Sequence, residues 1–320
     1  SIRYPVMMKS RRSKDLIANL CQDESPILFE GIQTCYSLTH PLLNKRNKFI
    51  KIHNIEWKYY KALSKASNNP FKKLFYLSES LRLYHNEHIF QHADYLIAVS
   101  KQEAQYYSKR FEKVKSFPCF HGNRNVTSQT GIGNYLLYHG NLEVEENIIA
   151  VGFLLDSILP FIQQKLIITG RNPGPSVVQK INKTPNAELI QNPADQTLTT
   201  LIRDAHIHLL PSFQNTGFKI KLVNTLYQGR HCLVTPEMVE GSGLEELCIV
   251  AKSSEDFILK INELMKTPFT REEIDHREHY LNSYFNDIRN AESIRDLIFG
   301  EPHTSNRKLK ADQNSASTKS

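Results

Sequence analysis

The stretch 209–235 constrains the fold of this 320-residue chain more than any other segment. It consists of LLPSFQNTGFKIKLVNTLYQGRHCLVT: an apolar run ends at Pro211, a polar turn follows, and an amphipathic segment closed by Gly229 leads to a second apolar run. This order is typical of a strand, a loop, a helix and a strand. Such a unit belongs to a parallel α/β sheet, because parallel strands need a crossover connection.

The same alternation recurs on both sides of one polar stretch. Strand patterns cover 25–29, 47–52, 94–99, 135–139, 165–169, 207–210 and 248–251, and helical patterns cover 55–66, 70–92, 100–110, 145–159, 196–204, 254–265 and 271–298. The stretch 117–133 is polar and contains glycine, so it predicts a linker. We therefore expect an α/β protein with two doubly wound, Rossmann-like parallel-sheet domains.

The expected domain boundaries follow from that linker. Residues 1–117 form the first domain, 118–134 the linker, and 135–300 the second domain with its C-terminal helices. The polar segment 301–320 lacks periodicity and is expected to be a disordered tail. Because the sequence begins at Ser1 without Met, in a stretch that looks like the middle of a protein, we expect the first domain to be truncated.

The amino-acid composition indicates a globular protein without a membrane span. Hydrophobic residues make up 40% of the chain and charged residues 23%, as in soluble globular proteins. No apolar run of about 18 residues predicts a membrane span, and the N-terminus has no signal-peptide pattern. The five cysteines are scattered without a C-x-x-C pair, which predicts free thiols in a reducing cytoplasm.

Charge is unevenly distributed along the chain. Residues 1–117 contain 20 Lys and Arg against 10 Asp and Glu, a net charge of +10, whereas residues 118–300 contain 16 against 21, a net of −5. The first half is expected either to meet an anionic partner, such as the inner-membrane surface, or simply to be solvated. Nucleic acid is not an expected partner, because RNP-like aromatic motifs and zinc spacings are lacking. The expected localisation is cytoplasmic, with peripheral attachment to the inner membrane as an alternative.

The loop that precedes the amphipathic segment has the composition of a phosphate site. A loop between a strand end and a helix start collects free backbone N–H groups and the positive end of the helix dipole. Gly217 lets a ligand approach closely, and Lys219 and Lys221 add positive charge. These residues predict a site for the diphosphate of a nucleotide-sugar; the alternative is an ordinary turn with solvated lysines.

Six segments resemble glycosyltransferases of the GT-B fold and are similar to family 4, the group 1 bacterial transferases. YHGNLEVEEN (138–147), LIITGRNP (166–173), TGFKIKLVNTLYQGR (216–230) and VEGSGL (239–244) resemble the C-terminal domain of that family. HNIEWKYY (53–60) and ADYLIAVSKQEAQYY (93–107) resemble its N-terminal domain. The resemblance implies a hexosyltransferase-type enzyme (EC 2.4) that moves a sugar from a nucleotide-sugar to a glycan or lipid-linked acceptor in polysaccharide or cell-envelope biosynthesis. It also implies retention of anomeric configuration and no metal or other cofactor.

The loop and the resemblance together give a set of site residues. The expected donor-binding residues are Gly140, Asn141, Arg171, Thr216, Gly217, Lys219, Lys221 and Asn224, and the expected catalytic residues are His53 and Glu56. For His53 the alternative is a histidine that caps a strand, and for Glu56 a carboxylate that orients its helix. Trp57 and Tyr60 either stack on sugar or belong to the core.

Two departures from the family pattern motivate an alternative function. The family's two glutamates, eight positions apart, are replaced by Thr216 and Asn224, although an amide at Asn224 can still bond a ribose hydroxyl. The family's Arg and Lys after the HGNL-like strand are replaced by Asn141 and an acidic run that includes Glu146. The alternative is a non-catalytic relative that binds nucleotide or glycan. His85, His88 and His92 have the spacing of metal ligands on one helix, but we expect a solvated or packed face.

Overall fold

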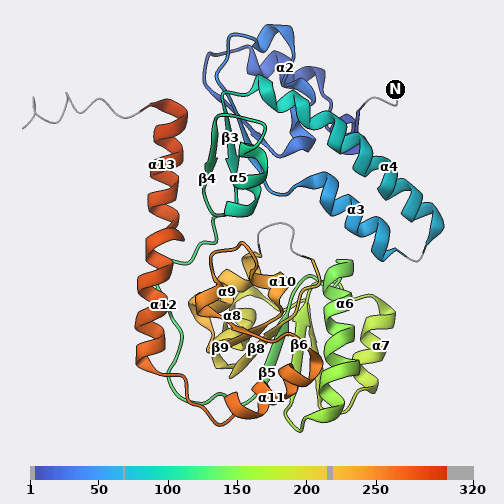
Figure 1. Ribbon diagram of the computed structural model, residues 1–320, viewed down its shortest axis with the longest axis vertical. Helices are drawn as coiled ribbons and strands as arrows, with labels where there is room; N and C mark the ends of the chain where they lie inside the picture. Colours follow the sequence, from blue (N-terminus) through green and yellow to red (C-terminus); the bar gives the residue numbers. More distant parts are fainter. Residues whose placement is uncertain (1–3, 68, 215–218, 301–320) are drawn as a thin grey trace, which may run out of the picture.

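The computed structural model describes residues 4–67, 69–214 and 219–300. The expected tail and two expected donor-binding residues, Thr216 and Gly217, lie outside the described residues. Within them, two separate parallel sheets form two lobes, one above the other in Figure 1, with helices packed around each. The prediction of an α/β protein built on two parallel sheets is confirmed. No described helix is long and apolar enough to cross a bilayer.

The N-terminal sheet has four parallel strands in chain order. They are β1 (Ile27–Glu30), β2 (Lys48–Ile52), β3 (Tyr95–Ala98) and β4 (Val114–Ser116). Each strand pairs in parallel with the next, so every connection crosses over outside the sheet. The carboxyl ends of these strands therefore share one edge, where His53 follows β2 directly.

Five helices accompany this sheet. They are α1 (Val6–Lys9), α2 (Lys14–Leu20), α3 (Glu56–Ala66), α4 (Pro70–Asn86) and α5 (Lys101–Ser108), with short 3-10 turns at Ile32–Ser37, Pro41–Leu43 and Glu87–His92. Helix α4 begins where it does because the Asn69 side chain accepts hydrogen bonds from two backbone N–H groups of the first turn. Ser100 caps α5 in the same way, as predicted. Helices α3 and α4 form a hairpin that projects to one side of the lobe (Figure 1).

The C-terminal sheet has six parallel strands in the order β10-β9-β8-β5-β6-β7. They are β5 (Leu136–His139), β6 (Leu166–Gly170), β7 (Ala187–Gln191), β8 (Ile207–Leu210), β9 (His231–Val234) and β10 (Ile249–Val250). This is the doubly wound order of a Rossmann fold, and the direction of winding reverses between β5 and β8. Every residue of β5, β6, β8 and β9 is buried, as expected for parallel strands covered on both faces.

Eight helices of the described part of the chain follow β5. They are α6 (Glu145–Phe153), α7 (Pro175–Lys183), α8 (Asp195–Asp204), α9 (Ile220–Gln228), α10 (Pro236–Val239), α11 (Ser254–Leu264), α12 (Arg271–Tyr284) and α13 (Asp287–Phe299). The long C-terminal pattern is a helix pair, because Asn286 caps a new helix after α12 ends. Helix α13 lies beside the N-terminal lobe in Figure 1.

Some elements differ from the sequence prediction for identifiable reasons. The pattern 70–92 is one α-helix only as far as Asn86, and a 3-10 turn begins at Glu87. In that turn the buried Glu87 carboxylate accepts hydrogen bonds from the Tyr106 and Tyr107 hydroxyls of α5. The pattern 145–159 is helical to Phe153 and then widens into a π-turn before Pro160. Strands β4 and β7 were not predicted, since neither has a fully buried residue and hence no clear apolar pattern.

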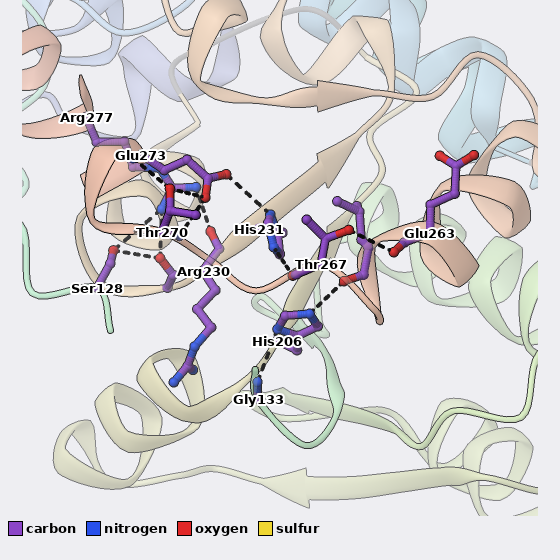
Figure 2. A network of polar contacts seen from close by, with 12 residues as sticks. Ser128, Gly133, His206, Arg230, His231, Glu263, Thr267, Thr270, Glu273 and Arg277 are labelled. Carbon is purple, nitrogen blue, oxygen red and sulfur yellow. Dashed lines mark hydrogen bonds and ion pairs between the residues drawn. The ribbon is translucent and has the colours of Figure 1, made fainter. Parts of the chain in front are cut away.

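The linker is fastened to the amino-terminal edge of the second sheet, as Figure 2 shows. The Gly133 N–H donates to His206 Nδ1 at 3.1 Å, and His206 Nε2 donates to the Leu264 carbonyl at 2.7 Å. The buried Arg277 of α12 donates to the Gly229 and Arg230 carbonyls at 2.7 and 2.6 Å. This edge is therefore closed by polar contacts, which leaves the opposite, carboxyl edge for a ligand.

Gly229 is the C-cap of α9, as predicted, and its N–H donates to the Thr225 carbonyl. Its φ of −97° is not left-handed, so glycine is required here for space rather than for its backbone conformation. A Cβ at this position would lie 2.1 Å from Nε2 of His208, whose ring is completely buried in β8. The close packing of α9 against β8 therefore depends on the missing side chain.

We expect Gly229→Ala to lower the free energy of unfolding by about 1–3 kcal/mol, because the new methyl group overpacks a buried ring. The matched control is Gly152→Ala in α6, where a Cβ would lie no closer than 3.8 Å to its nearest neighbour, Lys180 Nζ. That change is expected to raise stability by about 0.5–1 kcal/mol, because alanine favours the helix interior. Urea unfolding of both variants checks the prediction; equal stabilities would contradict it.

Candidate functional site

The carboxyl ends of β5 and β8 form the switch point of the second sheet. Gly140 and Asn141 follow β5, while Lys219 and Lys221 begin helix α9 beyond β8. Chain segments diverge at this point, and ligands of doubly wound sheets bind in the crevice outside the strand ends. The structure thus places four of the expected donor-binding residues at one edge.

Two glycines bring the strand ends into close contact. A Cβ on Gly170, the last residue of β6, would lie 1.9 Å from the Gly140 carbonyl oxygen, so only glycine fits there. A Cβ on Gly140 would lie 3.2 Å from the Asn147 side chain. Asn147 in turn donates to the Asn141 carbonyl at 2.8 Å, which fixes the loop between β5 and α6. The amino-terminal turn of α6 is therefore held against the strand ends.

Lys219 forms a largely buried ion pair in this turn. Its Nζ lies 2.6 Å from Oε1 of Glu146, and the two side chains are only 12% and 17% exposed. The Ser212 hydroxyl, just after β8, donates to the same carboxylate oxygen. Glu146, one of the acidic residues that replace the family's basic clamp, therefore neutralises a lysine that was expected to bind phosphate.

Lys221 is held by neutral partners. Its Nζ donates to Asn147 Oδ1 at 2.7 Å and to the Tyr138 hydroxyl at 3.4 Å, and lies 5.1 Å from the centre of the Tyr138 ring. Burial lowers the pKa of Lys221 to about 8, with Glu146 acting in the opposite direction. The amine is a cation at neutral pH with no carboxylate bonded directly to it, which suits an incoming anion.

His139, at the end of β5, is part of the wall of this site. Its Nε2 lies 2.9 Å from the Thr225 hydroxyl of α9. Burial, reinforced by the nearby Lys221 charge, lowers the pKa of His139 to about 3. The imidazole is therefore neutral at physiological pH and adds no charge to the site.

The remaining expected donor residues are less closely grouped. Arg171 follows β6 and is exposed, with its guanidinium 3.9 Å from the Asp195 carboxylate. The Asn224 side chain accepts a hydrogen bond from Asn123 of the linker at 2.8 Å. The structure therefore brings Gly140, Asn141, Lys219 and Lys221 together. The backbone of Arg171 lies beside them, since its carbonyl accepts from the Leu142 N–H at 3.1 Å, but its guanidinium and the Asn224 amide have other partners.

The expected catalytic residues lie at the carboxyl edge of the first sheet. His53 Nε2 is 2.8 Å from Oε2 of Glu30, and the other oxygen of that carboxylate, Oε1, is 3.4 Å from Lys51 Nζ. Because β1 and β2 are parallel neighbours, their ends place Glu30 and His53 side by side. His53 is partly exposed and carries a carboxylate partner that can hold its ring in one orientation.

Glu56 begins α3 and lines a small recess together with His53, Gly31 and Trp57. Burial raises the pKa of Glu56 to about 7. A carboxyl group that changes protonation near neutral pH is suited to proton transfer. The neighbouring Trp57 and Tyr60 pack against the core, with Trp57 Nε1 donating to the Tyr106 hydroxyl, so the core interpretation holds for these aromatics.

Electrostatics connect the two lobes near the site. The pKa of the Tyr59 hydroxyl in α3 is raised, mainly by burial and next by the Glu146 carboxylate of α6. Such an influence requires proximity, and Figure 1 shows α3 above the end of α6. The lobes also meet where the Ser116 and Tyr284 hydroxyls lie 3.1 Å apart.

Sequence reasoning missed the roles of Tyr138, Glu146, Asn147 and Ser212. No local pattern identifies them, because each acts on a lysine more than 60 positions away or on a partner of that lysine. His85 lies near the end of α4 and His88 and His92 in the 3-10 turn after it, and among the described residues no group of three or more His, Cys, Asp or Glu is placed to hold a metal ion.

Comparison with solved structures gives the fold. HepE from Anabaena, solved with UDP and glucose, has a TM-score of 0.61 at 13% identity over 88% of this chain and 80% of its own. An S. aureus TarM variant, solved with fondaparinux, α-GlcNAc-glycerol and UDP, has a TM-score of 0.58 at 10% identity over 85% and 55%. The GtfA/B complex has a TM-score of 0.57 at 12% identity over 87% and 58%. The chain has the GT-B fold.

One curated relative is similar in sequence. An uncharacterized 44.6 kDa protein in the cps region of Klebsiella pneumoniae is 27% identical over 252 residues, which cover 75% of this chain. The chain spans 64% of that relative's length. No family model matches the sequence.

The pKa of Lys221 makes anion binding dependent on pH. We expect the affinity of this site for inorganic pyrophosphate to fall as pH rises through about 8, by up to about tenfold per pH unit, because the neutral amine cannot pair with a diphosphate. Calorimetric titration between pH 6.5 and 9 measures this. Lys221→Arg, which stays charged, should flatten the profile; an equally steep profile in that variant would contradict the assignment.

Proposed function

We propose that the chain is a glycosyltransferase that moves a sugar from a nucleotide-sugar donor to a glycan or lipid-linked acceptor in polysaccharide or cell-envelope biosynthesis. The observation that carries the proposal is the pair of largely buried lysines at the switch point of a Rossmann sheet. HepE was solved with UDP and glucose, and the Klebsiella relative lies in a cps region, which agrees with this substrate class. The proposal includes retention of anomeric configuration.

The donor side is assigned to the second lobe. Sugar transfer requires stabilisation of the negative charge that develops on the leaving diphosphate. We assign this role to the Lys221 amine and the N–H groups at the start of α9, with Gly140 and Asn141 admitting the phosphates. Lys219 contributes when the diphosphate competes with Glu146 for its amine. Thr216, Gly217, Arg171 and Asn224 remain proposed donor contacts.

The acceptor side is assigned to the first lobe. The acceptor hydroxyl must be aligned with the anomeric carbon, which needs positioned polar groups opposite the donor. His53, oriented by Glu30, and Glu56, with its raised pKa, lie at the carboxyl edge of the first sheet. We assign His53 to contact with the sugar or acceptor, and Glu56 to hydrogen bonding of a hydroxyl.

The Lys219–Glu146 ion pair also favours a second candidate, a non-catalytic relative that binds nucleotide or glycan. A carboxylate that already neutralises Lys219 weakens the stabilisation of a leaving group. Binding of a nucleotide-sugar without its transfer or hydrolysis would favour this candidate over the enzyme.

Donor binding is tested by thermal stability with UDP-, GDP-, ADP- and CMP-sugars. At 100 times its dissociation constant, the correct donor should stabilise the protein by about 2.7 kcal/mol. Lys221→Ala should lower the affinity for that donor by about tenfold or more, because a hydrogen bond to a charged group is lost. The matched control, Lys266→Ala on the exposed surface, should bind normally. No stabilisation by any of these donors at millimolar concentration would contradict the proposal.

Glu56→Gln should separate stability from activity. Burial raises the pKa of Glu56 from 4.5 to about 7, so the wild type loses stability between those two values, where the carboxyl is ionised in the unfolded state but still protonated in the folded state. At pH 8 the variant should therefore be more stable than the wild type by about 1 kcal/mol or more, and at pH 4, below both values, about equally stable. Transfer activity should nevertheless fall.

Urea unfolding at the two pH values and an assay of sugar transfer measure these effects. Glu263→Gln, an exposed carboxylate on α11, is the control and should change neither quantity. Full activity of Glu56→Gln would remove this residue from the site.

A further inference from the structure

Helix α4 presents a row of large apolar side chains to solvent. Phe71, Leu74, Leu77, Leu81 and Tyr84 recur at spacings of three or four residues, and all are exposed, Phe71 to 83%, Leu74 to 68% and Leu81 to 56%. Residues spaced in this way lie on one face of a helix. We call this row the α4 stripe; the exposed Phe75 lies beside it.

The opposite face of α4 packs against the lobe with mostly polar residues. Its buried residues are Glu79, Ser80, Leu83 and Asn86. The Ser80 hydroxyl donates to the Trp57 carbonyl at 2.7 Å, and Glu79 pairs with Arg82 and accepts from the Val6 N–H at 2.6 Å. Helix α4 therefore buries polar residues and exposes apolar ones, the opposite of an ordinary surface helix. A row of exposed apolar groups marks an interaction surface.

A row of lysines borders the stripe. Lys58, Lys61 and Lys65 lie at i, i+3 and i+7 of α3 and are all exposed. The Trp57 ring joins the two rows, since its centre lies 5.3 Å from that of Tyr84 and 5.9 Å from Lys61 Nζ. The hairpin in Figure 1 thus carries an apolar row and a cationic row on neighbouring helices.

The charges of the hairpin indicate which kind of partner binds to the α4 stripe. Lys72 and Lys73 add two exposed cations to α4, whereas the only acidic residues between 56 and 86 are Glu56, in the recess, and the buried Glu79. A second copy bound through the same hairpin would bring like charges together, which is unfavourable. An anionic bilayer complements both rows, because apolar side chains enter the headgroup boundary while lysines meet the lipid headgroups.

We infer that α4 and the lysine row of α3 form the docking surface for an anionic lipid bilayer. Helix α4 has 17 residues and is about 25 Å long, so it can lie along the membrane plane. Helix α3 begins at Glu56, so the docked hairpin is continuous with the proposed acceptor side. The inference concerns attachment to the bilayer and does not depend on sugar transfer.

Co-sedimentation with lipid vesicles tests the inference without any nucleotide-sugar. The wild-type chain should bind vesicles of phosphatidylcholine mixed with phosphatidylglycerol, bind phosphatidylcholine alone weakly, and be released as salt is raised. Leu74→Gln combined with Leu81→Gln should weaken binding by about tenfold or more, because two apolar side chains no longer enter the boundary. Lys61→Glu combined with Lys65→Glu should also weaken binding to the mixed vesicles.

The matched control is Leu259→Gln on α11, because Leu259 is 58% exposed but lies in the other lobe. It should bind vesicles like the wild type, and all variants should keep the wild-type melting temperature because only exposed side chains change. The inference is overturned if the wild type fails to bind the mixed vesicles, or if the leucine variants bind unchanged. It is equally overturned if light scattering shows a wild-type dimer that the leucine variants dissociate, since the stripe then joins two copies.

Discussion

The contact between the first turn of α6 and the start of α9 holds the candidate site together. Lys219 pairs with Glu146, and Lys221 bonds to Asn147, at a point where the sheet reverses its direction of winding. Buried amines are costly unless they are paired, so these contacts tie the two halves of the second sheet across the switch point. Any anion bound there must replace or join these partners.

The two edges of the second sheet have opposite roles. At the amino-terminal edge, Arg277 and His206 bind backbone carbonyl groups and fasten the linker and α12 to the strands. At the carboxyl edge, glycines keep the strand ends close, and the amine of Lys221 has only neutral hydrogen-bond partners. The first lobe adds a carboxyl group of raised pKa at Glu56. The proposed donor side, which is cationic, and the proposed acceptor side, which can be protonated, together match the requirements of sugar transfer.

Much of the fold follows from local patterns. Buried parallel strands are continuous apolar runs, so β5, β6, β8 and β9 were predictable. Strands β4 and β7 were not, because their residues are only partly buried. In the site, Lys219 and Lys221 were predictable from their place at a helix start. Their partner Glu146 appeared only as an acidic substitution in the family pattern, because the ion pair joins residues 73 positions apart.

The sequence by itself determined the alternation of strands and helices, the place of the lysines beyond β8, and the periodic row from Phe71 to Tyr84. Only the tertiary structure decided that Glu146 neutralises Lys219, that Gly229 makes room for His208, and that the apolar row of α4 faces solvent. Periodicity shows that a helix has an apolar face, but the packing of its other face decides what covers it. In α4 that other face is occupied by hydrogen-bonded polar residues such as Ser80 and Glu79, so the apolar row is turned outward.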